Sequence, residues 1–217
     1  MGRFTHKRLP SLYRKASGHA PSKPIPFRQG SLDSLCGLYA LINALRLAQS
    51  KGAFKARIDW HLVFRDLLEA LDRKWWLRDI VYDGMDTKEL QFCLTTAKAY
   101  LWRRHRILMQ VAWRWKKKQR LTLTPELQKL RLMLERPNTV AMLSYSLKAY
   151  DHWSVIQEIR QDCIILCDSL GNRPLRLSHL HFNAQQILRS TMTYVVGSED
   201  LIVLEFEDAK ATSKGRS

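Results

Sequence analysis

Apolar and polar positions follow a helical period in the first half of the chain and a β pattern in the second. The clearest helical repeat is Leu38, Leu41, Ile42, Leu45 and Ala48. It predicts a helix that starts near Cys36 and stops at Gly52. Residues 31–34, Ser-Leu-Asp-Ser, are of types that cap helices. Because this helix is apolar nearly all round, we expect it to be central and buried.

Three more helices are predicted, over residues 59–72, 87–102 and about 124–135. Asp59 is placed to cap the first of them. Asp86 and Glu89 have the spacing of a capping box at the start of the second. Pro125 is expected at the first helical position of the third, where its missing N–H does no harm.

Strand patterns lie mainly after Asn138. The predicted strands are 107–115, 139–147, 152–159, 163–168, 174–177, 193–196 and 201–206. The 163–168 strand is apolar on both faces, which predicts a place inside the sheet. Helices followed by an antiparallel sheet indicate an α+β domain over 27–208. We expect residues 1–26, with four prolines, to form a mobile basic arm and residues 209–217 to form a disordered tail.

Composition narrows the class of protein. The 217 residues are 46% hydrophobic, yet no apolar run is long enough for a membrane-spanning helix. The basic N-terminus lacks the apolar stretch of a secretory signal. Four cysteines are too few for a disulfide scaffold, so we expect reduced thiols and a cytoplasmic location. No phosphate-binding or cofactor motif is present, and we expect no cofactor.

The net charge of +16 is concentrated in two stretches. Residues 1–28 and 90–125 contain basic but no acidic side chains. Such segments attract polyanions, so an acidic partner or nucleic acid is a possible ligand, although no nucleic-acid motif accompanies the charge. Trp102, Trp113 and Trp115 lie among these basic residues, where they can stack on bases or pack against Arg stems.

Candidate chemistry centres on Cys36, in the first turn of the predicted buried helix. The positive end of a helix and a nearby imidazolium both stabilise a thiolate. His152 opens a predicted strand, and Asp168 follows it by sixteen residues. If the chain turns near residue 160, His152 and Asp168 lie directly opposite each other in a hairpin. Asp168 then orients His152, and His152 accepts the thiol proton.

Two additions complete this hypothesis. If the hairpin contains a one-residue bulge, we expect the pairing of His152 with Asp168 to break. Ser169 or Asn172 would then take the place of Asp168 as the residue that orients His152. Gln29 lies seven residues before Cys36, in the loop that leads into the helix. Its side-chain amide is a candidate donor to an oxyanion, together with the backbone N–H of Cys36.

The segments Gln29…Cys36-Gly37, His152-Trp153 and Asp168 together resemble the papain-like cysteine peptidases, and most of all the bacteriocin-processing (C39-like) branch. The resemblance covers roughly residues 27–48 and 138–178. It implies a papain-like fold, a thiolate–imidazolium pair of Cys36 and His152, an orienting Asp168 and an oxyanion hole with Gln29. Leu35 departs from that branch, which often has an acidic residue before the cysteine.

The sequence therefore predicts a thiol hydrolase that cleaves a peptide or isopeptide bond in a protein or peptide substrate. Acyl transfer or deamidation of the transglutaminase type uses the same residue order and stays open. A third alternative is a binding protein on a peptidase-like scaffold. Cys163, Cys167, His179 and His181 also allow a metal site, but paired cysteines along an apolar strand favour core packing.

Overall fold

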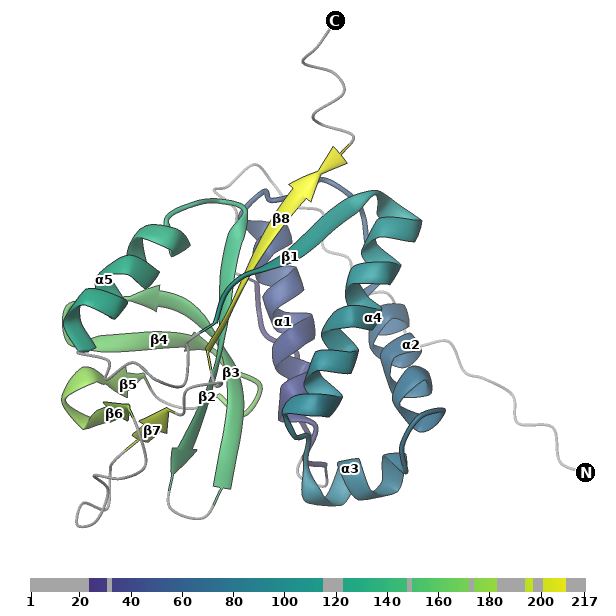
Figure 1. The fold of residues 1–217 in the computed structure, drawn as a ribbon, viewed down its shortest axis with the longest axis horizontal. Coiled ribbons are helices and arrows are strands. Elements are labelled where there is room, and N and C mark those ends of the chain that lie inside the picture. Colours follow the sequence, from purple (N-terminus) through teal and green to yellow (C-terminus); the bar gives the residue numbers. More distant parts are fainter. Residues whose placement is uncertain are drawn as a thin grey trace, which may run out of the picture.

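The computed structural model describes residues 24–30, 33–114, 123–147, 150–171, 174–182, 194–196 and 201–209. Four N-terminal helices pack on one face of a mostly antiparallel sheet, and a fifth helix covers part of the other face (Figure 1). The predicted α+β class is confirmed. The expected arm lies outside the described residues up to position 23, and the expected tail lies outside them from position 210.

The helices are α1 (Cys36–Ser50), α2 (Trp60–Asp72), α3 (Leu77–Asp83), α4 (Thr87–His105) and α5 (Leu123–Leu134), with a short 3₁₀ turn at Leu177–His179. The strands are β1 (Ile107–Arg114), β2 (Thr139–Leu147), β3 (Tyr150–Ile159), β4 (Cys163–Cys167), β5 (Leu175–Arg176), β6 (Leu180–Phe182), β7 (Tyr194–Val196) and β8 (Leu201–Asp208). Each predicted helix and strand has a counterpart. The sequence patterns did not predict α3 or β6.

The sheet has the strand order β1-β8-β2-β3-β4-β5, and β7 pairs with β2 and with β6. β4 lies between β3 and β5, which confirms its predicted place inside the sheet. Among the described strands, β6 and β7 form the one parallel pair.

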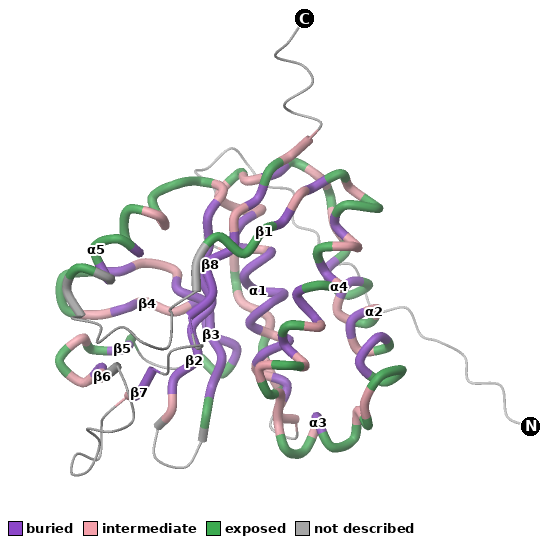
Figure 2. The backbone as a smooth tube through the Cα atoms, in the orientation of Figure 1, coloured by how far each residue is buried: buried purple, intermediate pink, exposed green. Residues whose placement is uncertain are grey.

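α1 is the centre of the larger core. It lies between the sheet on one side and α2 and α4 on the other (Figure 2). Leu38, Leu41, Ile42 and Leu45 have no exposed surface. The all-round burial follows from the all-round apolar pattern of the sequence. A second, smaller core lies on the opposite face of the sheet, beneath α5.

The start of α1 differs from the prediction. Its N-cap residue, Leu35, has no side-chain capping bond. Asp33 instead uses one carboxylate oxygen to accept from the N–H of Leu35, at 3.2 Å, and the other to accept from Gly30, at 3.1 Å. Asp33 therefore folds the loop before the helix. The expectation that residues 31–34 cap the helix is wrong for Asp33 and Ser34, and residues 31 and 32 lie outside the described part.

The N-termini predicted for α2 and α4 are capped as expected, whereas α5 begins at Leu123, two residues before Pro125. Asp59 accepts from the backbone N–H groups of His61 and Leu62. Asp86 and Glu89 form the capping box that opens α4. α4 runs three residues beyond its predicted end, and Arg106 then stops it in a left-handed conformation with φ of 61°.

The packing of α1 leads to a stability prediction. We expect Leu41→Ala to lower the free energy of unfolding by about 2–5 kcal/mol, because it removes a side chain with 0% exposure and leaves a cavity. Leu132→Ala is the matched control, since Leu132 is 64% exposed on α5, and it is expected to change stability by less than about 0.5 kcal/mol. Urea unfolding of both variants tests this; equal losses would contradict the central role of α1.

Candidate active site

His152 and Asp168 form a buried hydrogen-bonded pair. The distance between Nε2 of His152 and Oδ2 of Asp168 is 2.8 Å, and both side chains are almost fully buried. The second carboxylate oxygen of Asp168 accepts from the backbone N–H of Leu170, at 2.8 Å. On the neighbouring strand β2, the ring of Tyr145 packs edge-on against His152, with ring centroids 5.6 Å apart. These contacts fix the imidazole in one orientation.

The hairpin register that produces this pair is not the predicted one. Ile159 pairs with Ile164 and Glu158 with Ile165, whereas Ile156 pairs with Leu166 and Val155 with Cys167. Gln157 is thus an extra residue, a β-bulge. The chain turns at Gln161 and Asp162, closed by a 2.8 Å bond from the N–H of Arg160 to the carbonyl of Cys163. His152 and Asp168 are therefore not directly opposed.

The bulge has the opposite effect to the one expected. The pairs Ile159–Ile164 and Glu158–Ile165 define the register next to the turn. If this register continued, Asp168 would lie opposite Val155. The side chain of Val155 points to the other face of the sheet from that of His152. Past the bulge at Gln157, the same continuation places Asp168 opposite Ser154, on the side of His152 and diagonal to it. The bulge brings Asp168 to His152 rather than replacing it.

The alternative third residues can also be placed. Ser169 is buried, and its hydroxyl lies 3.4 Å from the side-chain oxygen of Gln29. Asn172 lies outside the described residues. Asp168 is the residue that contacts the imidazole.

Cys36 is the first residue of α1 and is partly exposed. Its thiol lies close enough to the imidazole of His152 to raise the pKa of that histidine. The neighbouring Gly37 shows how closely the helix start approaches β3: a methyl group in its place would lie 3.6 Å from the indole of Trp153 and 3.5 Å from the sulfur of Met85. The three predicted residues Cys36, His152 and Asp168 therefore form one connected group.

The electrostatics of this group favour a charged imidazole. Burial by itself lowers the pKa of His152, but hydrogen bonds with Asp168 and Cys36, and the negative charge of both partners, raise the pKa to about 9. A histidine with such a pKa is protonated at neutral pH. The arrangement therefore stabilises an imidazolium between a carboxylate and a sulfur.

Gln29 lies next to the group but makes contacts that were not predicted. Its backbone N–H donates to the carbonyl of Ser169, at 3.2 Å, which ties it to the turn after Asp168. Its side-chain nitrogen donates to the carbonyl of Asp33. An amide nitrogen carries two hydrogens, so one N–H remains beyond the bond to Asp33.

Residues 24–30, called here the 24–30 segment, hold Gln29 in place through contacts with two elements. On α1, the buried amide of Asn43 accepts from the N–H of Phe27, at 2.7 Å, and donates to its carbonyl, at 3.2 Å. At the turn after Asp168, the guanidinium of Arg28 lies against Gly171, which has φ of +73°. A Cβ on Gly171 would lie 2.0 Å from that guanidinium. The positive φ favours glycine there, and a larger residue would also displace the guanidinium of Arg28.

Sequence reasoning missed the neighbour of Cys36 on its other side. α3 is joined to the loop before the helix by bonds from the N–H and hydroxyl of Ser34 to the carbonyls of Val81 and Tyr82. Two aromatic side chains of this region are strongly exposed, Trp76 at 79% and Tyr82 at 71%. The polar Asn43 and Arg46 within an otherwise apolar helix were the sequence signals for the contacts of the 24–30 segment.

The other candidate residues do not gather into a site. Cys163 and Cys167 both lie on β4, where Cys167 packs into the larger core. Nowhere among the described residues do three His, Cys, Asp or Glu side chains meet as a metal ion requires.

Of the basic segments, the described part includes exposed Lys98, Arg103 and Arg104 on α4, and the guanidinium of Arg106 lies 5.4 Å from the ring centre of Trp102. Residues 115–122 lie outside it.

Comparison with models of known protein families found no match, and no curated protein matches the chain. Within the described ranges, no helix has both the length and the apolar character needed to cross a bilayer.

The His152–Asp168 pair predicts a specific titration. The pKa of His152 in the folded protein, about 9, lies above the ordinary histidine value of 6.5. Its protonation therefore stabilises the fold fully below about pH 6.5, and this contribution is lost as the pH rises toward 9. We expect the imidazole carbon signals in an NMR titration to report a midpoint near 9, and Asp168→Asn to move that midpoint down.

Asp162→Asn is the matched control, because Asp162 is an exposed carboxyl of the same hairpin and makes no contact with the imidazole. The titration midpoint of His152 in this variant should stay within a few tenths of a pH unit of the midpoint in the unaltered protein. A midpoint at or below 6.5 in the unaltered protein would contradict the charged pair.

Proposed function

We propose that this protein is a papain-like thiol hydrolase that cleaves a peptide or isopeptide bond. The observation that carries the proposal is the connected group of Cys36, His152 and Asp168. A nucleophile at a helix start, a base within hydrogen-bond reach and a buried carboxylate that orients the base are the three parts of a covalent acyl-transfer site. They lie on elements far apart in the sequence, as the resemblance to the papain-like peptidases leads one to expect.

The proposed reaction begins with attack of the Cys36 sulfur on the carbonyl carbon of the substrate. Since Nε2 of His152 contacts Asp168, Nδ1 is the nitrogen available to Cys36. The tetrahedral intermediate collapses as the protonated Nδ1 gives its proton to the leaving amine, and the C–N bond breaks. Water, deprotonated by the now neutral His152, then attacks the thioester. The products are the free acid and the restored thiol group.

The negative oxygen of the intermediate needs donors at the start of α1. The first amides of a helix have no partners within the helix, and no side chain of Leu35 caps them here. We assign the backbone N–H of Cys36 and the remaining side-chain N–H of Gln29 to this role. The exposed aromatic rings of Trp76 and Tyr82, on the α3 side, offer a surface for a peptide chain.

The same group also supports transfer of the acyl group to an amine instead of water. The two outcomes differ in the acceptor alone. Incubation with a mixed peptide library, in ¹⁸O-labelled water and with a fluorescent primary amine present, distinguishes them by mass spectrometry. Hydrolysis places ¹⁸O in a new carboxyl end, whereas transfer attaches the amine. Neither product, with Cys36→Ala indistinguishable from the unaltered protein, would favour a binding protein on this scaffold.

The proposed function predicts that Cys36 is selectively reactive. Burial raises the pKa of Cys93 to about 12 and that of Cys167 to about 11. Burial and a hydrogen bond with Asp162 also raise the pKa of Cys163. These three thiols are therefore protonated at neutral pH, while Cys36 has an imidazolium partner. Iodoacetamide at pH 6.5 should label Cys36 at least tenfold faster than the others, as measured by peptide mapping.

His152→Ala is expected to slow the labelling of Cys36 to the rate of an ordinary thiol. His61→Ala is the matched control, because His61 lies on α2 and makes an edge contact with Phe27 rather than with Cys36. Equal labelling of all four cysteines in the native protein would refute the assignment of the nucleophile.

A further prediction concerns the turnover of any substrate found in the mixed peptide library. We expect His152→Ala to abolish it and Asp168→Asn to reduce it, since the carboxylate orients the base but does not move the proton. Gln29→Ala should lower kcat roughly 10²–10³-fold, the usual effect of removing one oxyanion donor. Gln91→Ala is the matched control, because Gln91 is exposed on α4. Full activity of Gln29→Ala would remove Gln29 from the oxyanion hole.

A further inference from the structure

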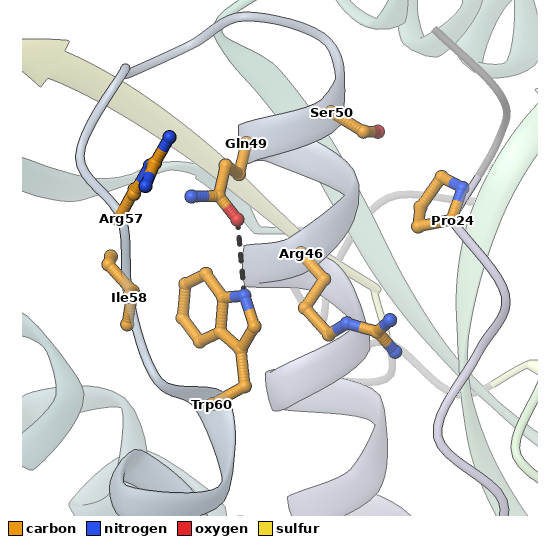
Figure 3. A pocket seen from close by; sticks show the side chains of 7 residues that line it. All are labelled: Pro24, Arg46, Gln49, Ser50, Arg57, Ile58 and Trp60. Carbon is orange, nitrogen blue, oxygen red and sulfur yellow. Dashed lines mark hydrogen bonds between the residues drawn. The ribbon is translucent and has the colours of Figure 1, made fainter. Parts of the chain in front are cut away.

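A pocket of about 550 Å³ lies along the C-terminal half of α1, and two arginines are among the residues that line it. Figure 3 shows Arg46 and Arg57 on opposite sides of this pocket, with other lining side chains between them. Arg46 donates to the carbonyl of Ile25, at 2.7 Å, and its guanidinium lies 4.1 Å from the ring centre of Phe27. Arg46 therefore fastens the 24–30 segment to α1, and the two guanidiniums do not meet at one ligand.

The exposed residues of α4 are arranged differently, because they follow one another along a single side of the helix. They recur every three or four residues, at Lys88, Gln91, Thr95, Lys98 and Trp102. Residues at these spacings are neighbours on a helix surface, so they form one row that faces solvent, called here the α4 row. No residue of the α4 row is acidic. The buried residues of the helix lie on its other side, and they are Leu90, Cys93, Leu94, Ala97 and Leu101.

Trp102 lies between two cations at the C-terminal end of this row. Lys98 precedes it by four residues and is its neighbour on the helix surface. Arg106, just past the helix, places its guanidinium 5.4 Å from the centre of the indole ring, which is the distance of a cation–π contact. Two backbone bonds hold Arg106 there, since its N–H donates to the carbonyl of Trp102, at 3.1 Å, and its carbonyl accepts from Ala209, at 3.2 Å. The side chain of Trp102 stays 43% exposed, so the ring can take a further partner.

The charge at this end of α4 is positive. Residues 90–114 contain no acidic side chain, and the nearest carboxylates by strand pairing are Glu207 and Asp208 at the end of β8, opposite the start of β1. The C-terminal pole of α4 adds about half a negative charge. Exposed cations outnumber these negative charges, and in the described part of the chain none of the cations is in an ion pair. The four cations are Lys98, Arg103, Arg104 and Arg106.

We propose that single-stranded nucleic acid binds along the α4 row, with one base stacked on Trp102 and the phosphates on either side of that base paired with Lys98 and Arg106. An exposed aromatic ring flanked by cations binds single strands without sequence preference, because every base has an aromatic face and every nucleotide a phosphate. A duplex keeps its base faces stacked inside, and an acidic peptide would use the cations alone. The proposal is independent of the chemistry proposed for Cys36.

The test measures the affinity of the full chain for fluorescein-labelled strands of about 12 nucleotides, oligothymidylate and oligouridylate, by fluorescence anisotropy. We expect saturable binding of one or both strands that weakens steadily between about 50 and 200 mM NaCl, because phosphate contacts release counterions. Trp102→Ala should weaken the affinity about tenfold or more, since the stacked base is lost. The rest of the positive charge of the protein attracts any polyanion, so the effect of the ring is the specific result.

Two matched controls accompany the variants. Trp76→Ala removes a ring that is 79% exposed at the start of α3, and it should change the affinity by less than about twofold. Lys98→Gln should lower the slope of log Kd against log salt concentration by about 0.7, the value for one phosphate contact of a single strand. Lys129→Gln removes an exposed lysine from α5, on the other face of the sheet, and should leave that slope unchanged.

Arg106→Gly is a second variant that protects the test against misfolding. Arg106 has φ of 61°, a conformation that glycine adopts readily, so this variant removes the cation and is expected to keep the melting temperature of the unaltered protein. It should weaken the affinity severalfold. The proposal would be overturned by absent saturation with both strands, by equal effects of Trp102→Ala and Trp76→Ala, or by unchanged affinity of Arg106→Gly. Equal competition by a duplex of the same length or by polyglutamate would overturn it as well.

Discussion

The burial of α1 is the constraint on which the rest of the structure depends. A helix with apolar residues on all sides is stable in water only when other elements cover all of it, and here the sheet, α2 and α4 do so. Close packing then fixes the helix along its axis as well as around it. Its first residue, Cys36, is thereby held against β3, and the 24–30 segment is held along its side through Asn43 and Arg46. The candidate active site is thereby positioned by a packed helix.

Much of this fold could be predicted because its elements carry local signals. The caps of α2 and α4 are set by side chains within three residues of each helix start, and such short-range bonds are visible in sequence. α3 gives no comparable signal, since it has seven residues and one buried side chain, Ile80. The bulge at Gln157 likewise cannot be predicted from the sequence of a single strand. It exists because two strands pair in a particular register, which no single segment specifies.

The candidate site was predicted for a reason that was only partly correct. The order and spacing of Cys36, His152 and Asp168 indicated three residues that lie together in the fold, but the direct opposition assumed for His152 and Asp168 does not occur. A diagonal pair across two strands still brings an imidazole and a carboxylate together, provided that both point to the same side. The bulge at Gln157 supplies that condition. The contacts of Gln29 with Ser169 and Asp33 depend on loops that meet only in the folded chain, and spacing alone does not predict them.

The uncapped start of α1 has a physical explanation in the charges around it. α2 and α4 each begin with an aspartate whose carboxylate occupies the first amides, whereas α1 has neither a side-chain cap nor an acidic residue in its first turn. An aspartate there would neutralise the positive pole of the helix and repel a thiolate at Cys36. In the proposed state, the imidazolium lies between two anions, so the three side chains together carry a net negative charge. The positive pole of α1 can partly balance this charge, and its first amides can then receive the oxyanion. A missing cap that costs about 1 kcal/mol of stability is in this view part of the site.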